Sequence, residues 1–141
     1  MTEYELVQSW FSGIEGLGKL AKLDWQTAGF QFLLPAKEQS ALEHQIQYYE
    51  NMLRWSEQLS GKRYALLDRC LNWLHANQPT SDALSLSWGD AKLGNCVFQN
   101  GQLTGMLDWE RPALSSPVDD LSWWLMLDQS LCTGYGVPRL E

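Results

Sequence analysis

The sequence predicts an α+β fold that is mainly helical, and three observations support this class. In the first half of the chain, apolar residues recur at spacings of three and four, the period of amphipathic helices. The period then changes after the third helix, and Asn100-Gly101 further along is a dipeptide typical of two-residue β-hairpin turns. An apolar segment after Pro117 predicts one more helix. The chain should therefore contain three helices, a small hairpin and a final helix.

Three helices are expected before the hairpin. Their ranges are 4–23, 40–59 and 63–77, with a connecting loop at 24–37. Ser40 is the expected N-cap of the second helix because Glu43 stands at its third helical position, and Gly61 ends that helix. The third helix stops before Pro79, since the residue before a proline disfavours the helical conformation.

Short strands follow the helices. They are expected at 83–88, 96–99 and 102–107, before a helix behind Pro117 and a closing loop with Gly134, Gly136 and Pro138. The loop between the first two strands holds residues 89–95, and Asp108 stands where the last strand ends. We therefore expect Asp90 and Asp108 at the same end of one small sheet, because sites are commonly built from loops on a rigid scaffold.

Composition narrows the functional classes. The 141 residues suffice for one folded domain, because 45% are apolar and eight are tryptophan. A formal charge of −7 argues against binding nucleic acid or an anionic membrane surface. The chain has no apolar run near the roughly 20 residues of a membrane span. Its three cysteines form no C-x-x-C pair, which favours a reducing compartment, so a cytoplasmic location is expected.

Asp90, Asn95 and Asp108 form the pattern that Mg²⁺-dependent phosphoryl transfer needs. The oxygens of Asn95 and Asp108 suit a hard cation, and Asp90 is left to accept a proton from an acceptor hydroxyl. Lys92 would place an ammonium near the transferred phosphoryl group. Alternatively, both aspartates cap turns, Asn95 forms an Asx-turn and Lys92 is solvated. The combination with the hairpin favours the site.

Three segments carry a family resemblance: Gly89-Asp90-Ala91-Lys92-Leu93-Gly94-Asn95, Leu107-Asp108-Trp109-Glu110 and Pro117-Val118-Asp119-Asp120-Leu121. They resemble the C-terminal lobe of the aminoglycoside phosphotransferase and choline kinase-like family. Bacterial members similar to the kinase-like domain found with acyl-CoA dehydrogenases look most alike. The resemblance implies a protein kinase-like C-terminal lobe, a transferase that uses ATP and Mg²⁺, and a small-molecule hydroxyl acceptor.

The resemblance also implies individual roles. Asp90 resembles the family's catalytic aspartate, Asn95 and Asp108 resemble its metal ligands, and Asp120 resembles the aspartate that braces the catalytic loop. Lys92 stands where relatives carry a basic residue or histidine, while Glu110 matches the motif without an assigned role. Gly89 and Gly94 would allow a tight loop.

Several positions depart from the family pattern. Trp88 and Ala21 stand where relatives usually have histidine, and Ser115-Ser116-Pro117 replaces the usual Gly-Asp-Pro. An indole can only donate a hydrogen bond, so Trp88 puts the geometry of the catalytic loop in question.

We expect residues 1–141 to form a single partial domain that lacks the N-terminal ATP-binding lobe and the C-terminal helices of the family. Nothing before Leu6 could supply the glycine-rich hairpin and lysine of such a lobe. Residues 13–19 fit most of a Walker phosphate loop, but Leu20 replaces its Ser or Thr, and an amphipathic helix fits them better. The chain alone should therefore be inactive or weakly active.

Two alternatives stay open. The chain could instead be a non-catalytic truncated or pseudo-kinase module for binding or self-association, through the surface left by the missing lobe. Trp123 and Trp124, with Trp109, could form an aromatic wall for a cationic or lipid-like acceptor, or they could pack in the core.

Overall fold

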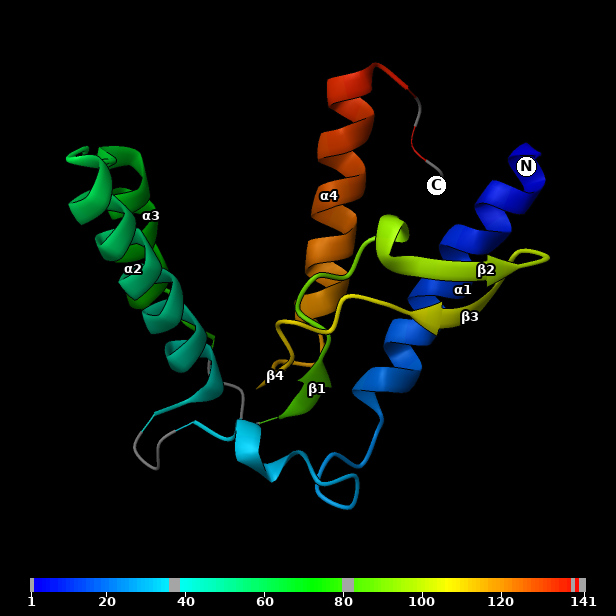
Figure 1. Cartoon of the computed structure of the whole chain (residues 1–141), viewed down its shortest axis with the longest axis horizontal. Coiled ribbons are helices and arrows are strands. Elements are labelled where there is room, and N and C mark those ends of the chain that lie inside the picture. The colour runs from blue at the N-terminus through cyan, green and yellow to red at the C-terminus, as the bar shows by residue number, and fades with distance from the viewer. Residues whose placement is uncertain (1, 36–38, 80–82, 138, 140–141) are drawn as a thin grey trace.

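The computed structural model describes residues 2–35, 39–79, 83–137 and 139, and these residues form a mainly helical α+β fold. Its elements are α1 (Glu3–Ala21), the 3-10 helix η1 (Phe30–Leu33), α2 (Ala41–Ser60), α3 (Ala65–Ala76), β1 (Ser85–Ser87), the 3-10 turn η2 (Leu93–Asn95), β2 (Cys96–Gln99), β3 (Gln102–Met106), β4 (Ala113–Ser115) and α4 (Asp119–Tyr135). Figure 1 shows α1, α4 and the strands as one body, with α2 and α3 paired beside it.

The strands form two separate antiparallel sheets, so the expectation of one small sheet is wrong. β2 pairs with β3 through the predicted turn, where Asn100 and Gly101 both have positive φ. β1 instead pairs with β4, with Ser85 opposite Ser115. β4 was not predicted, because a strand of three residues without a flanking hairpin turn has no detectable period.

The helix ends follow the local sequence signals in most places. Ser40 Oγ accepts a hydrogen bond from Glu43 N at 3.0 Å, and Gly61 ends α2 with φ of 66°. Thr2 and Glu5 form a capping box at the start of α1, which the sequence analysis missed.

Two expected loops need correction. α4 continues through Gly134 to Tyr135 and ends at Gly136, so the closing loop begins later than predicted; Pro138 lies outside the described residues. The connection between α1 and α2 also contains η1, whereas positions 36–38 of that connection are not described.

The core lies between α1, α4 and the segment after β1. Its buried residues are Trp10, Leu17, Trp88, Ala91 and Trp124. Gly13 lets α1 approach α4, because a Cβ there would overlap the Trp124 ring, and Gly16 in the same way accommodates Leu103. The Walker-like segment therefore lies inside α1, where two of its glycines serve helix packing.

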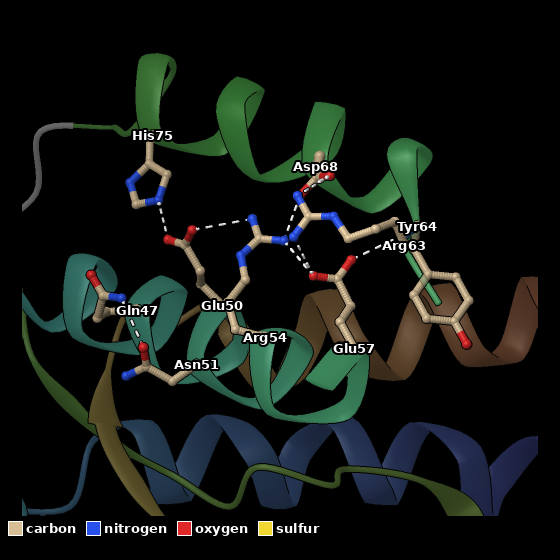
Figure 2. A network of polar contacts seen from close by, with 9 residues as sticks. All are labelled: Gln47, Glu50, Asn51, Arg54, Glu57, Arg63, Tyr64, Asp68 and His75. Carbon is tan, nitrogen blue, oxygen red and sulfur yellow. Dashed lines mark hydrogen bonds and ion pairs between the residues drawn. The ribbon is translucent and has the colours of Figure 1, made fainter. Parts of the chain in front are cut away.

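A polar network joins α2 to α3 (Figure 2). The buried carboxylate of Glu57 accepts hydrogen bonds at 2.9 Å from both Arg54 and Arg63, and at 3.1 Å from Tyr64 N. Arg54 also reaches Asp68 on α3 at 2.6 Å. Charged groups thus hold together a pair of helices with few buried apolar residues.

Among the described residues, no helix is both long and apolar enough to cross a membrane. The three cysteines are free thiols, with Cys70 exposed and the other two half-buried.

Candidate active site

The segment that links β1 to the Asp90 loop is held by one carboxylate. Asp120, buried in the first turn of α4, accepts hydrogen bonds from Ser87 Oγ at 3.0 Å, Trp88 N at 2.7 Å and Gly89 N at 2.9 Å. Gly89 has φ of 89°, and a Cβ at this position would overlap the carbonyl of Arg111. Only glycine fits this position without strain, so the turn before Asp90 has one defined shape.

Trp88 joins this segment to the loop after β3. Its side chain is fully buried, and its indole Nε1 donates a hydrogen bond to Leu107 O at 2.8 Å. Its ring also lies 6.0 Å, centroid to centroid, from the ring of Trp109. The single donor of the indole therefore connects the two loops that carry Asp90 and Asp108.

Three donors converge on the carboxylate of Asp90. Lys92 Nζ lies 2.5 Å and Asn95 Nδ2 3.0 Å from Oδ2, and Trp123 Nε1 lies 3.3 Å from Oδ1. The hydrogen bond from Lys92 lowers the pKa of Asp90 most; burial opposes this shift, and the bonds from Asn95 and Trp123 add to it. Asp90 is therefore ionised at neutral pH. The same contact raises the pKa of Lys92.

Asn95 links the loop of Asp90 to the loop of Asp108. Its backbone carbonyl accepts a hydrogen bond from Leu107 N at 2.8 Å. Its amide Nδ2 donates to both Asp90 O and Asp90 Oδ2, which leaves Oδ1 without a partner among the described residues. Asp108 is exposed, has φ of 63°, and adds to the raised pKa of Lys92 through its charge. Asp90, Lys92 and Asn95 thus form one hydrogen-bonded cluster, and the charge of Asp108 acts on Lys92 from the neighbouring loop.

The two glycines of the motif differ. Gly89 needs its positive φ, whereas Gly94 lies in η2 without a positive φ. A Cβ at Gly94 would meet open space. The conformational reason expected for glycine therefore applies to Gly89 and not to Gly94.

The adjacent tryptophans Trp123 and Trp124 have different environments. Trp124 is buried in the core, as one of the two alternatives held. Trp123 is exposed, contacts Asp90 and lines a cavity without Trp109 or Trp124, so the expected wall of three tryptophans is not formed there. Consecutive residues on a helix point in different directions, so Trp124 of α4 packs in the core while the adjacent Trp123 contacts the site.

A cavity of about 310 Å³ adjoins the cluster. Its lining includes Gly89, which precedes Asp90 in the chain, and Trp123, which donates a hydrogen bond to Asp90. Arg111, Asp119 and Asp120 also line the cavity. Burial raises the pKa of Asp119, an effect that the hydrogen bond from Ser115 Oγ opposes and the charge of Asp120 reinforces. Neither Arg111 nor Asp119 was predicted from the sequence as a site residue, and for Asp119 the available signal was its place beside Asp120.

Comparison with known proteins supplies the remaining findings. The sequence model of the phosphotransferase enzyme family matches residues 5–138. Over 104 residues the chain is 25% identical to acyl-CoA dehydrogenase family member 10 from Mus musculus, a match that covers 72% of this chain and 9% of that protein.

A crystal structure from Ralstonia eutropha JMP134, provisionally assigned as an aminoglycoside phosphotransferase, has a TM-score of 0.74 to this chain at 22% sequence identity. The likeness covers 89% of this chain and 38% of that one. The chain thus spans less than half the length of each of these proteins, and the structural likeness shows a shared fold.

Proposed function

Since this chain belongs to the phosphotransferase enzyme family, we propose that it is the C-terminal lobe of an ATP- and Mg²⁺-dependent enzyme that phosphorylates a hydroxyl group of a small molecule. The hydrogen bond from Leu107 N to Asn95 O carries the proposal. It ties the loop after β3, with Asp108, to the loop that presents Asp90 and Asn95. An acid for the acceptor and oxygens for a metal are needed side by side in this reaction.

Asp90 is the proposed catalytic residue that orients the acceptor hydroxyl and accepts its proton. Its lowered pKa keeps the carboxylate ionised at neutral pH, and in this state it can accept a hydrogen bond from the acceptor hydroxyl and orient it. Lys92 would contribute positive charge next to the transferred phosphoryl group. The hydrogen bonds to Asp120 support a positioning role for this residue, because they hold the turn before Asp90.

Asn95 and Asp108 are the proposed Mg²⁺ ligands. The free Oδ1 of Asn95 and the exposed carboxylate of Asp108 are both hard oxygen donors. Within the described ranges, no group of three or more His, Cys, Asp or Glu residues could hold a metal. Two protein donors suit Mg²⁺, which usually keeps waters and substrate phosphate oxygens as its other ligands. When bound, Mg²⁺ would neutralise charge on the phosphates.

We further propose that residues 1–141 are a partial domain and that tight ATP binding needs a second lobe. The segments described before β1 are helices and their connections, so they offer no strand hairpin to cover the phosphates. The solved relative, of which this chain covers 38%, is consistent with a longer functional unit. On this proposal the isolated chain is inactive or nearly so.

A second candidate function is that of a non-catalytic module for binding or self-association. Exposed aromatic side chains on α2, α3 and α4 favour it, among them Trp55, Trp73 and Tyr135. Such apolar surface commonly marks a protein interface. Light scattering over a range of concentrations tests this alternative: a chain that stays monomeric throughout, with its exposed aromatics in water, contradicts self-association.

Calorimetric titration with ATP tests the main proposal. With Mg²⁺ present, we expect weak binding at millimolar ATP, which Asp108→Ala abolishes and Glu110→Gln leaves unchanged. Glu110 is the matched control because it is an exposed acid on the same loop without a proposed metal role. No heat at millimolar ATP, or equal heat without Mg²⁺, contradicts the proposal.

Phosphate release from ATP provides the second measurement. We expect the isolated chain to release almost none. Release that disappears in Asp90→Ala would support the assignment of Asp90, yet it would contradict the proposal that the isolated chain is inactive.

A further inference from the structure

The cavity beside Asp90 has walls that are mostly apolar. Leu42 and Ile46 of α2, Leu71 and Leu74 of α3, and Trp123 of α4 supply much of its lining. Its volume of about 310 Å³ lies at the lower end of the range for small-molecule sites. Trp123 lines the cavity and also donates a hydrogen bond to Asp90. The side chain of Trp123 therefore lies between a ligand in this cavity and the candidate catalytic carboxylate.

Arg111 places a cation in this apolar setting. Its guanidinium carbon lies 4.9 Å from the ring centroid of Tyr49 and 5.3 Å from that of Tyr48, so two aromatic rings hold it in place. None of the carboxylates in the described ranges forms an ion pair with Arg111, and none of its N–H groups donates a hydrogen bond to a described residue. Its five donors therefore remain available to a ligand.

The two acids that line the same cavity as Arg111 already accept hydrogen bonds from other residues. Asp120 accepts three hydrogen bonds from the loop, and Asp119 accepts one from Ser115. Burial disfavours the charged form of Asp119, because it raises the pKa of that carboxyl. Glu110 lies with Arg111 and His44 on a neighbouring cavity of about 370 Å³, yet it forms no ion pair with Arg111.

We propose that the acceptor is a small, largely apolar hydroxyl compound with an anionic group such as a carboxylate, which Arg111 binds while Asp90 faces the hydroxyl. A guanidinium matches a carboxylate with two parallel hydrogen bonds, and the apolar walls match the carbon chain between the two polar ends. The assignment of the ligand as an acceptor rests on the proposed phosphotransferase function.

Three probes with the same six-carbon chain test the inference on the unaltered protein: hexanoate, hexan-1-ol and hexylammonium. Calorimetry should show hexanoate binding about tenfold or more tightly than hexan-1-ol, because hydrogen bonds between charged groups are stronger than neutral ones. Hexylammonium should bind most weakly. Equal affinities, tighter binding of hexylammonium, or no saturable binding of hexanoate would each overturn the inference.

Variants test whether Arg111 is responsible for the preference for hexanoate. Arg111→Gln should remove the preference for hexanoate, Arg111→Lys should keep part of it, and Arg69→Gln should leave it unchanged because Arg69 is exposed on α3 away from the cavity lining. A preference that survives Arg111→Gln overturns the inference. Circular dichroism verifies the fold of each variant, and the comparison of probes on the unaltered chain stands without any variant.

The two proposals fail separately. A chain that binds Mg²⁺ and ATP as described above but shows no preference for hexanoate overturns the anionic-acceptor inference alone. A chain that binds hexanoate through Arg111 but never binds Mg²⁺ and ATP overturns the phosphotransferase proposal alone.

Discussion

The α2–α3 pair and the body of α1, α4 and the strands are stabilised in different ways. The body buries Trp10, Trp88 and Trp124 in one core. The pair instead exposes Trp55 and Trp73 and relies on the ion pairs of the network in Figure 2. The loop with Asp90 belongs to the body, where apolar packing and the hydrogen bonds to Asp120 hold it rigidly. The candidate catalytic groups thus lie on the part of the molecule with the more robust support.

A cavity and the side chain of Arg111 lie at the junction between the two regions. The 310 Å³ cavity lies there, with walls from both regions, and Arg111 reaches from the body to Tyr48 and Tyr49 of α2. A change in the α2–α3 pair should therefore alter the binding cavity more than the geometry around Asp90.

Two tryptophan substitutions give the sharpest contrast. Trp124→Ala should lower the free energy of unfolding by about 3–5 kcal/mol, because it removes a large buried side chain from the core. Trp73→Ala, at a side chain that is 63% exposed, should change it by no more than about 0.5 kcal/mol. Urea unfolding measures both. Similar losses in the two variants would show that the α2–α3 pair buries more in solution than the structure shows.

Two glycines in one loop should respond differently to substitution by alanine, because Gly89 has a positive φ and Gly94 has open space around its Cα. Gly89→Ala should destabilise the protein by about 1–3 kcal/mol from the positive φ alone, and overlap with the Arg111 carbonyl adds to this. Gly94→Ala should be neutral or stabilise by up to about 1 kcal/mol, since alanine restricts the unfolded chain. Thermal unfolding distinguishes them, and a destabilised Gly94→Ala variant would contradict this account of the loop.

The network between α2 and α3 should be sensitive to acid. Burial raises the pKa of Glu57, but hydrogen bonds from Tyr64 N and Arg54, with the charge of Arg63, outweigh it and lower the pKa overall. A lowered folded-state pKa means that the stabilisation is fully present above the unfolded value near 4.5 and disappears as the pH falls through the folded value. Glu57→Gln should therefore lower the melting temperature at pH 7 and have less effect at pH 3. An equal effect at both pH values would exclude a role for its charge.

The smallest expected effect on stability is that of Lys92→Met. It removes the hydrogen bond that most lowers the pKa of Asp90, so this pKa should rise toward its ordinary value of 3.8. The stabilisation from the pair is present above that value and is lost as the pH falls below it, so unfolding at pH 7 should change little for this partly exposed contact. Carboxyl carbon NMR would detect the shift, and an unchanged Asp90 pKa would show that the two side chains do not pair in solution.

Local chemistry determined much of this protein from the sequence alone. The N-cap at Ser40, the C-cap at Gly61 and the turn at Asn100-Gly101 each depend on a few neighbouring residues, and the structure has all three. The family likewise followed from three short motifs, and the family match confirms it. The spacing of Asp90, Asn95 and Asp108 predicted a cluster because a hairpin returns the chain to its starting point.

Only the tertiary structure decided the rest. The pairing of β1 with β4 split the expected sheet, Trp123 and Trp124 took different environments, and Arg111 came to lie against Tyr48 and Tyr49. Each of these facts joins residues far apart in the chain or depends on how a helix is rotated against its neighbours. Periodicity and turn chemistry carry no information about such contacts, because they arise from the packing of whole elements against each other.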